Sequence, residues 1–400
     1  MSFVFWLNLI ILVLLIAGHT ELLVAIVNRM GAIKFPTRKL KRLRLIHDVM
    51  IPLFAVALIW GVGCKSPGVL VGGSWRELSP AWGIYLTICA AGTCELSWSI
   101  IRRSIAKAPG FQISNHSWTV DIAERIAHRP VGNGPQRWLA NLPGNEIFQV
   151  EVSDKKYTLP RLPREWDGLS ILHLTDFHLQ GTPDRTFFEE SIQLAMDLQP
   201  DMAIFTGDLV EQERFLDWLP STLGRLQTRL GCYFILGNHD WPLDLNTIRS
   251  AMTDVGWTDV AGRVVTQDHL GHTLAIGGTE RPWIGEHPDF AQAPQDAFRL
   301  LLSHTPDHFS WAREQQVDLM CCGHNHGGQI VLPVIGPVYS PSSFGTRYAS
   351  GVYWEEPTML YVSRGLSGSH PLRYNCKPEL TKLTLHCPAN AERSDGSAVP

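Results

Sequence analysis

Five short polar segments of this 400-residue chain carry the residue types that bind metal ions in proteins. Aspartate, asparagine and histidine, without cysteine thiolates, suit borderline divalent metals such as Mn²⁺, Zn²⁺ or Fe²⁺. The segments are Asp176-Phe177-His178, Gly207-Asp208, Gly237-Asn238-His239-Asp240, His304 and Gly323-His324-Asn325-His326.

The spacing within these segments predicts a site with two metal ions. Asp176 and His178 are two residues apart, so an extended backbone would aim both side chains into one site. His324 and His326 repeat this spacing. A lone aspartate such as Asp208 can bridge two ions, and the asparagine of the third segment can supply a neutral carbonyl oxygen. Two ions about 3.5–4 Å apart can hold an attacking hydroxide and clamp a phosphoryl oxygen, which is the general logic of two-metal hydrolysis.

Each polar segment follows an apolar run that predicts a buried strand. The runs are residues 170–174, 202–205, 232–236, 299–303 and 317–322. Polar residues at the carboxyl ends of buried strands are where α/β sheets build their sites. Helix-like segments alternate with the first runs, at residues 184–198, 211–230 and 243–255, and another lies at 308–314. Residues 263–268 and 272–277 resemble strands, so the pattern predicts an α/β sandwich, and no GxGxxG or P-loop motif supports a nucleotide-binding fold.

The N-terminal quarter predicts a multi-pass membrane protein. Residues 3–27, 46–64 and 82–101 are apolar runs near the length of about 20 residues that spans a bilayer. Seven Lys and Arg residues lie between positions 29 and 44, and Arg102, Arg103 and Lys107 follow the third run, whereas the second loop offers only Lys65 and Arg76. The positive-inside rule therefore predicts that the first loop and everything after residue 101 face the cytoplasm.

Composition sets the remaining expectations for organisation and partners. We expect a transmembrane region at 1–104, a linker with an entry hairpin at 105–165, a catalytic domain at 166–387 and a disordered tail at 388–400. The hairpin would turn at Ser153-Asp154.

The net charge of −4 gives no reason to expect a nucleic-acid partner. The eight scattered cysteines form no CxxC pair and predict neither a zinc ribbon nor a disulfide framework. Lipid bilayer and a phosphoester substrate are the expected partners, and no obligate protein partner is inferred.

The order D-x-H, G-D, G-N-H-D, H and G-H-x-H resembles the calcineurin-like metallophosphoesterase family over about residues 169–387. This resemblance implies a four-layer αββα sandwich with a dinuclear site at the strand ends. It implies that the two ions share Asp208 and that the first is bound by Asp176, His178 and His326. The implied ligands of the second ion are Asn238, His304 and His324. Mn²⁺ is the expected metal, with Zn²⁺ or Fe²⁺ as alternatives.

The resemblance also implies a catalytic role for His239, together with Asp208. His239 would be the acid that protonates the leaving oxygen or steadies the phosphate. Family members often carry an aspartate three residues after the bridging one, where this chain has Glu211. Either Glu211 or Asp240 could therefore orient the imidazole of His239.

Within the family, the chain resembles membrane-associated bacterial members of the YkuE and YaeI kind. The residues that carry this likeness are 173–178, 237–241, 361–366, 371–373 and 378–380. Some such relatives hydrolyse UDP-2,3-diacylglucosamine during lipid A synthesis, which makes a lipid-linked phosphodiester or pyrophosphate the leading substrate hypothesis. The alternatives are a phosphomonoesterase or nucleotide phosphodiesterase, and a catalytically silent membrane scaffold. Side chains in predicted loops that could grip or stack on such a substrate are Arg281, Trp283, Arg347, Arg364 and Arg373.

Overall fold

The computed structural model describes residues 2–34 and 37–388, without the side chains of residues 37–42 and 44. Most side chains of the basic cluster in the first predicted loop are therefore not described, and the predicted tail after residue 388 lies outside the described residues. The chain divides into two compact units. A helical unit comprises Met1–Lys107 and Leu332–Arg347, and a catalytic unit comprises Ala108–Val331 and Tyr348–Pro400.

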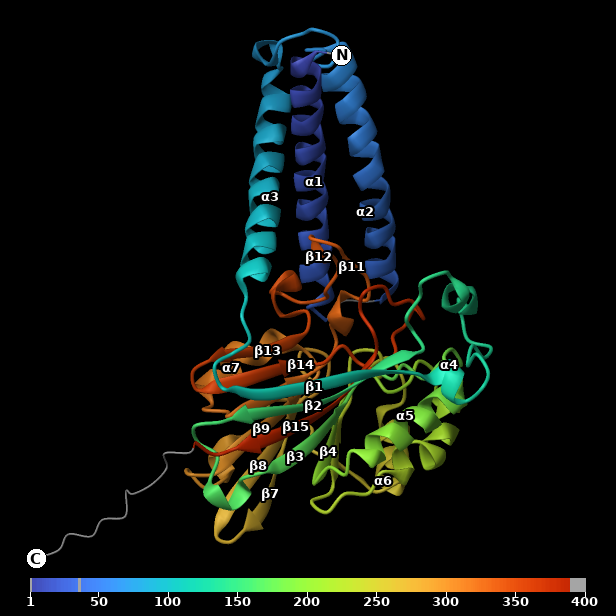
Figure 1. Ribbon diagram of the computed structural model, residues 1–400, viewed down its shortest axis with the longest axis vertical. Helices are drawn as coiled ribbons and strands as arrows, with labels where there is room; N and C mark the ends of the chain where they lie inside the picture. The colour runs from blue at the N-terminus through green and yellow to red at the C-terminus, as the bar shows by residue number, and fades with distance from the viewer. Residues whose placement is uncertain (1, 35–36, 389–400) are drawn as a thin grey trace, which may run out of the picture. The chain divides into compact units, whose positions relative to one another are not determined.

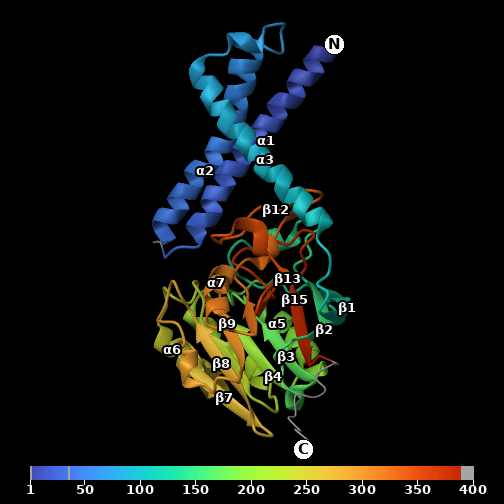
Figure 2. The same ribbon diagram turned by 90° about the vertical axis from the view of Figure 1, so that its left-hand side faces the viewer.

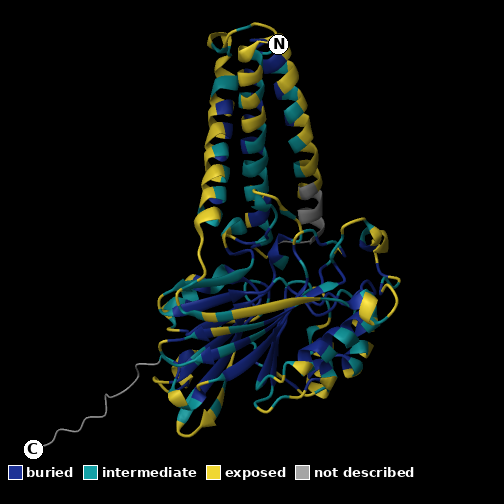
Figure 3. Cartoon of the chain, viewed as in Figure 1, coloured by how far each residue is buried: buried dark blue, intermediate teal, exposed yellow. Residues whose placement is uncertain are grey.

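Three long apolar helices form most of the helical unit. They are α1 (Phe3–Gly31), α2 (Thr37–Leu58), which a π-helical turn extends to Lys65, and α3 (Pro80–Ile105). All three are long and apolar enough to cross a membrane, as predicted. Many of their apolar residues are exposed (Figure 3). Helices α1 and α3 cross closely (Figure 2), and a Cβ atom added to Gly18 would lie only 1.9 Å from the Cys89 carbonyl oxygen.

The rest of the helical unit comes from far along the sequence. Residues 332–347, which we call the docked segment, include most of a small hairpin of β11 (Val331–Leu332) and β12 (Gly336–Pro337). The Asn28 side chain of α1 donates a hydrogen bond to the Val338 carbonyl at 3.2 Å and accepts one from the Ser340 amide at 3.0 Å. Arg103 of α3 donates to the Ile335 carbonyl. No local pattern in the sequence indicates this return of the chain to the helices.

Two sheets form the centre of the catalytic unit (Figure 1). In spatial order, the seven strands of the first are β1 (Gln112–Asp121), β2 (Gln149–Thr158), β15 (Glu379–His386), β3 (Leu169–Leu174), β4 (Met202–Thr206), β5 (Cys232–Ile235) and β6 (Trp257–Asp259). The six of the second are β13 (Gly351–Glu355), β14 (Thr358–Val362), β10 (Leu319–Cys322), β9 (Phe298–Ser303), β8 (His272–Thr279) and β7 (Val264–His269). Strands β3 to β6 run parallel, and so do β8, β9, β10 and β14.

Alternating side chains explain why the sheets pack as layers. Ile171 and Ile204 point into one core cluster with Ile276 of the second sheet. Their neighbours Leu172 and Phe205 point the other way, into a cluster with α5 (Arg185–Asp197) and α6 (Leu245–Asp254). The period of two residues therefore gives each central strand two buried faces. On the second sheet, the short helix α7 (Phe309–Glu314) lies against β14, and the predicted α/β sandwich is confirmed.

Two local predictions differ from the structure. Residues 211–230 form 3₁₀ turns at Glu213–Ser221 and Leu223–Arg225 in place of a helix, since Pro220 and Gly224 interrupt the helical pattern. Residues 147–159 do not turn back at Ser153-Asp154; β2 runs through as one strand. This polar pair has partners across the sheet, Ser117 for Ser153 and Lys382 for Asp154, which removes the need for a turn.

Candidate metal centre

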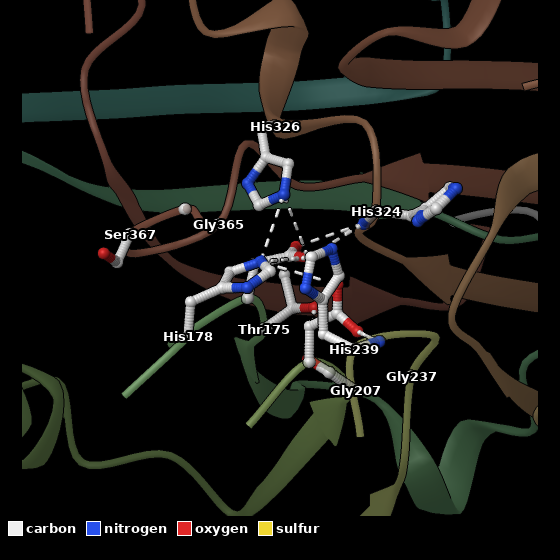
Figure 4. A network of polar contacts seen from close by, with 12 residues as sticks. Thr175, His178, Gly207, Gly237, His239, His324, His326, Gly365 and Ser367 are labelled. Atoms are coloured by element: carbon white, nitrogen blue, oxygen red, sulfur yellow. Dashed lines mark hydrogen bonds and ion pairs between the residues drawn. The ribbon is translucent and has the colours of Figure 1, made fainter. Parts of the chain in front are cut away.

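The five polar segments meet where strands of both sheets end. Asp176 and His178 follow β3, Asp208 follows β4, and the third segment follows β5, all in the first sheet. His304 follows β9 and the last segment follows β10 in the second sheet. In Figure 4, the imidazoles of His178, His239 and His326 converge on one small volume. The structure thus brings together every residue that was predicted as a ligand.

One group of potential ligand atoms belongs to Asp176, His178, Asp208 and His326, all within 4.8 Å of one another. The Nε2 atoms of His178 and His326 are 3.2 Å apart. His178 Nε2 lies 3.4 Å from Asp208 Oδ2, and His326 Nε2 lies 3.7 Å from Asp176 Oδ1. These spacings leave room for one cation among two imidazoles and two carboxylates.

A second group shares Asp208 with the first and adds His304 and His324. His304 Nε2 lies 3.2 Å from Asp208 Oδ2 and 3.2 Å from His324 Nδ1. The Asn238 side-chain oxygen lies 2.9 Å from His304 Nε2, so it faces the same volume. Asp208 is therefore the one carboxylate common to both groups.

Hydrogen bonds on the far side of two rings show that these residues fit metal ions. Nδ1 of His178 faces the Glu211 carboxylate at 2.7 Å, and Nδ1 of His304 faces the Thr206 carbonyl at 2.8 Å. Each acceptor holds the proton on Nδ1 and leaves the Nε2 lone pair for a metal. The buried Asp208 Oδ2 atom accepts no hydrogen bond from any described residue. Such an orphaned oxygen beside imidazole lone pairs is satisfied by a cation.

The backbone at the candidate ligands is left-handed, not extended as the sequence spacing suggested. The residues with positive φ are Asp176 (56°), His178 (44°), Asp208 (57°), His324 (68°) and His326 (49°). This conformation is uncommon for residues other than glycine and clusters at functional sites. A sharp turn at the strand ends therefore aims these side chains, and not the two-residue repeat of an extended strand.

Two glycines let the segments approach each other. A Cβ atom on Gly237 would lie 2.2 Å from Asp208 Oδ1, and one on Gly323 would lie 2.2 Å from Asp176 Oδ2. Both distances are far below van der Waals contact. Any side chain at these positions would displace a carboxylate of the centre.

Glu211 connects the centre to His239. Its Oε1 atom lies 2.7 Å from His178 Nδ1 and 2.7 Å from His239 Nδ1. Asp240 has different partners, because its carboxylate accepts hydrogen bonds from the backbone amides of Leu209 and Gly237. Of the two carboxylates left open by the sequence, Glu211 therefore orients His239.

Charge near His239 favours its imidazolium form. Burial opposes that charge, but Asp208 and Glu211 outweigh burial and raise the pKa of His239 to about 9. Burial likewise opposes ionisation of Glu211, yet hydrogen bonds from His178 and His239 hold its pKa well below the ordinary range. The side chain of His239 is 32% exposed, whereas that of His178 is fully buried. His239 is thus the more accessible of the two imidazoles that contact Glu211.

Two of the five side chains considered for substrate contact are bound to partners inside the protein. Arg364 pairs with the buried Glu379 at 2.8 Å and with Glu151 at 2.6 Å. Arg373 is fully buried and donates to the carbonyls of His326 and Arg364. Buried charges of this kind need internal partners, which local sequence cannot reveal.

The other three side chains lie in different surroundings. Trp283 is buried, with its ring 5.0 Å from that of His324 between centroids, so it packs behind the second group. Arg281 pairs with Glu286 at the surface, and Arg347 belongs to the docked segment of the helical unit.

Comparison with known proteins identifies the family. The model of the calcineurin-like phosphoesterase family matches residues 169–328. The metallophosphoesterase YkuE of Bacillus subtilis is 30% identical over 250 residues, which cover 60% of this chain and 87% of the relative. The chain belongs to the calcineurin-like phosphoesterase family.

Two further relatives of this phosphoesterase carry more specific names. The transmembrane protein with metallophosphoesterase domain of Bos taurus is 29% identical over 330 residues, 74% of this chain and 70% of the relative. UDP-2,3-diacylglucosamine pyrophosphatase LpxG of Chlamydia muridarum is 29% identical over 286 residues, 55% of this chain and 85% of the relative. The predicted resemblance is confirmed, and the chain is a phosphoester hydrolase of a family that uses divalent metals.

Proposed function

We propose that this protein is a membrane-anchored phosphoesterase that uses two metal ions to hydrolyse a phosphodiester or pyrophosphate bond in a lipid-linked substrate. The observation that carries the proposal is the pair of ligand groups sharing Asp208. Asp176, His178 and His326 would hold the first ion. The ligands of the second would be Asn238, His304 and His324. Mn²⁺ is the metal we expect, and Zn²⁺ or Fe²⁺ would suit the same donors.

Bound ions would lower the pKa of a water molecule and neutralise charge on the phosphoryl oxygens. The chain's own residues would supply orientation and a proton. Glu211 holds Nδ1 of His239 at 2.7 Å, which leaves the Nε2 proton free to pass to the leaving oxygen. The Glu211 carboxylate beside Nδ1 favours the protonated form of this imidazole.

A lipid-linked substrate is supported by two independent observations. Three helices of the chain are long and apolar enough to cross a membrane. One relative is named for cleaving UDP-2,3-diacylglucosamine, a nucleotide sugar with acyl chains. Arg29 in the last turn of α1 and Arg102 in the last turn of α3 support a cytoplasmic location of the catalytic unit by the positive-inside rule.

A substrate screen tests this proposal. The full chain, extracted in detergent and loaded with Mn²⁺, would be given UDP-2,3-diacylglucosamine, phospholipids, cyclic nucleotides and simple phosphomonoesters. We expect cleavage of the acylated nucleotide sugar, and no cleavage by the Asp208→Ala protein. Preference for a monoester or a cyclic nucleotide would support the alternative in which the helices only set location. Absence of metal-dependent hydrolysis of any substrate would contradict the proposal.

A further inference from the structure

The tip of the β11–β12 hairpin is apolar and exposed. Its residues are Leu332-Pro333-Val334-Ile335, within the docked segment of the helical unit. Val334 is 83% exposed and Leu332 is 40% exposed. Exposed single apolar residues are common, but a run of four apolar residues of which three are exposed is not expected for a surface that faces only water.

The docked segment is fixed to the ends of two helices. Asn28, which holds Val338 and Ser340, lies in the last turn of α1, and Arg103 lies in the last turn of α3. Close packing accompanies these hydrogen bonds. A Cβ atom on Gly31 would lie 2.6 Å from the Pro341 Cβ, and one on Gly336 would lie 2.7 Å from Arg103 Nε. The hairpin therefore has a set position beside α1 (Figure 1).

The backbone at the tip adds a second observation. Val334 has a φ of 68°, which is costly for a β-branched residue and which glycine or asparagine would adopt more easily. A valine at this position exposes an apolar side chain and carries backbone strain at once. Contact of that side chain with lipid would offset both costs.

We propose that the tip of the docked segment inserts into the interfacial layer of the bilayer, beside the ends of α1 and α3. The inference rests on the proposed membrane location of the helices. The occupant is lipid because the segment is hydrogen-bonded to the ends of helices whose exposed apolar faces need lipid. The basic side chains of Arg29 and Arg102 in the same helix ends suit anionic headgroups. The expected depth is that of interfacial segments, about 5–10 Å into the headgroup and acyl boundary.

Insertion of the tip would give the enzyme a further attachment to the membrane. The hairpin begins at Val331, five residues after the candidate ligand His326. A lipid contact at the tip would tie the chain that leaves the metal centre to the membrane surface. This contact would be additional to the three spans.

A site-specific fluorescent label tests the insertion. Cys64, Cys94 and Cys387, the cysteines that are not buried, would be replaced by serine. One cysteine would then be introduced by Val334→Cys and labelled with an environment-sensitive dye. The full chain would be placed in vesicles of phosphatidylcholine and phosphatidylglycerol with and without a lipid that carries a quenching label near the headgroup end of its acyl chain.

Two matched positions make the result decisive. Leu270→Cys is the water control, because Leu270 is another apolar hairpin tip, 75% exposed and with a φ of 52°, but in the catalytic unit. Ile10→Cys is the lipid control, on an exposed face of α1.

We expect a blue-shifted, lipid-quenched signal at Val334→Cys and Ile10→Cys but not at Leu270→Cys. A signal at Val334→Cys that matches Leu270→Cys while Ile10→Cys is quenched would overturn the insertion and leave the spans intact. Loss of quenching at Ile10→Cys as well would overturn both the insertion and the membrane location. Cleavage of a water-soluble diester by each labelled protein would show that the catalytic unit is folded.

Discussion

Two clusters of buried polar side chains in the catalytic unit differ in whether the protein alone satisfies them. In the Glu379 cluster, one oxygen of Glu379 accepts hydrogen bonds from Lys155 at 3.0 Å and from Tyr361 and Thr381, and the other accepts one from Arg364 at 2.8 Å. Burial opposes the charge on Glu379, but these cations hold its pKa well below the ordinary range. The Glu379 cluster is complete with protein atoms.

The metal centre is the opposite case. Its Asp208 Oδ2 accepts no hydrogen bond from the described residues, and its imidazole nitrogens face one another at 3.2 Å. Five of its members have positive φ, whereas no member of the Glu379 cluster named above appears among the described residues with that conformation. The difference shows which buried polar group is built for structure and which is built for a ligand. A satisfied cluster stabilises the fold, while an unsatisfied and strained one needs cations.

The largest expected effect is that of Asp208→Ala, because it removes the carboxylate shared by both ligand groups. Turnover of bis-p-nitrophenyl phosphate should fall by roughly 10⁴-fold or more, which corresponds to about 5 kcal/mol of transition-state stabilisation. Metal content, measured by mass spectrometry of the purified protein, should fall with it. Near-normal hydrolysis by the Asp208→Ala protein would contradict the claim that the metal centre needs cations, since activity would then not depend on the shared ligand.

His239→Gln tests the acid separately from the metal ligands. We expect turnover to fall by about 10³-fold, within the usual range for loss of a general acid, with metal content close to that of the unaltered protein. The loss should be smaller for a substrate whose leaving group needs no proton, such as a p-nitrophenyl ester. Loss of metal from the His239→Gln protein would instead assign this residue to the ligands.

Glu379→Gln tests whether the Glu379 cluster stabilises the fold without a role in metal binding. It leaves the buried Lys155 without its carboxylate and Arg364 with Glu151 alone, and it should lower the free energy of unfolding by about 3 kcal/mol, measured by urea denaturation in detergent. Metal content per folded protein should not change. Glu286→Gln is the matched control, because its partner Arg281 is a surface residue and exposed ion pairs contribute about 0–1 kcal/mol. If Glu379→Gln removed metal as Asp208→Ala does, the two clusters would not be separate in function.

The smallest expected effect is that of Glu211→Gln, which keeps a hydrogen-bond acceptor beside His178 and His239 but removes its charge. Metal affinity and turnover should each fall by about 10–100-fold, as is usual for a partner of a metal-binding histidine. Titration of activity with Mn²⁺ would separate the two effects. The nearby Glu213, which contacts the Asp244 amide and neither histidine, supplies the control Glu213→Gln, for which no change is expected.

The sequence was sufficient to predict the sheets and the convergence of the ligand residues. Apolar runs such as 202–205 and the polar residues that follow them are local signals, and parallel strand ends necessarily meet at one edge. The choice of Glu211 over Asp240 and the partners of Arg364 were not predictable in this way. Glu211 contacts a histidine 33 positions earlier and Arg364 contacts a glutamate 213 positions away. Such contacts depend on the finished packing of the sheets.

Backbone conformation was the other feature that local patterns missed. Spacing of two residues in Asp176-Phe177-His178 is compatible with an extended chain, but positive φ at both ligands comes from the demands of the site. The intrinsic backbone preferences of these two residues disfavour positive φ, so this conformation cannot be predicted from the residue types. The helix expected over 211–230 failed for a simpler reason, which is the proline and glycine within it.

The docked segment also determines how this protein can be cut. Because residues 332–347 belong to the helical unit, the chain passes between the two units at three places: after Lys107, before Leu332 and after Arg347. A single proteolytic cleavage after Lys107 would break one connection and leave the docked segment held to α1 by Asn28. The two fragments should therefore migrate together until a denaturant separates them. A catalytic unit prepared without its helices would carry an unprotected apolar tip, and its solubility would depend on shortening that loop.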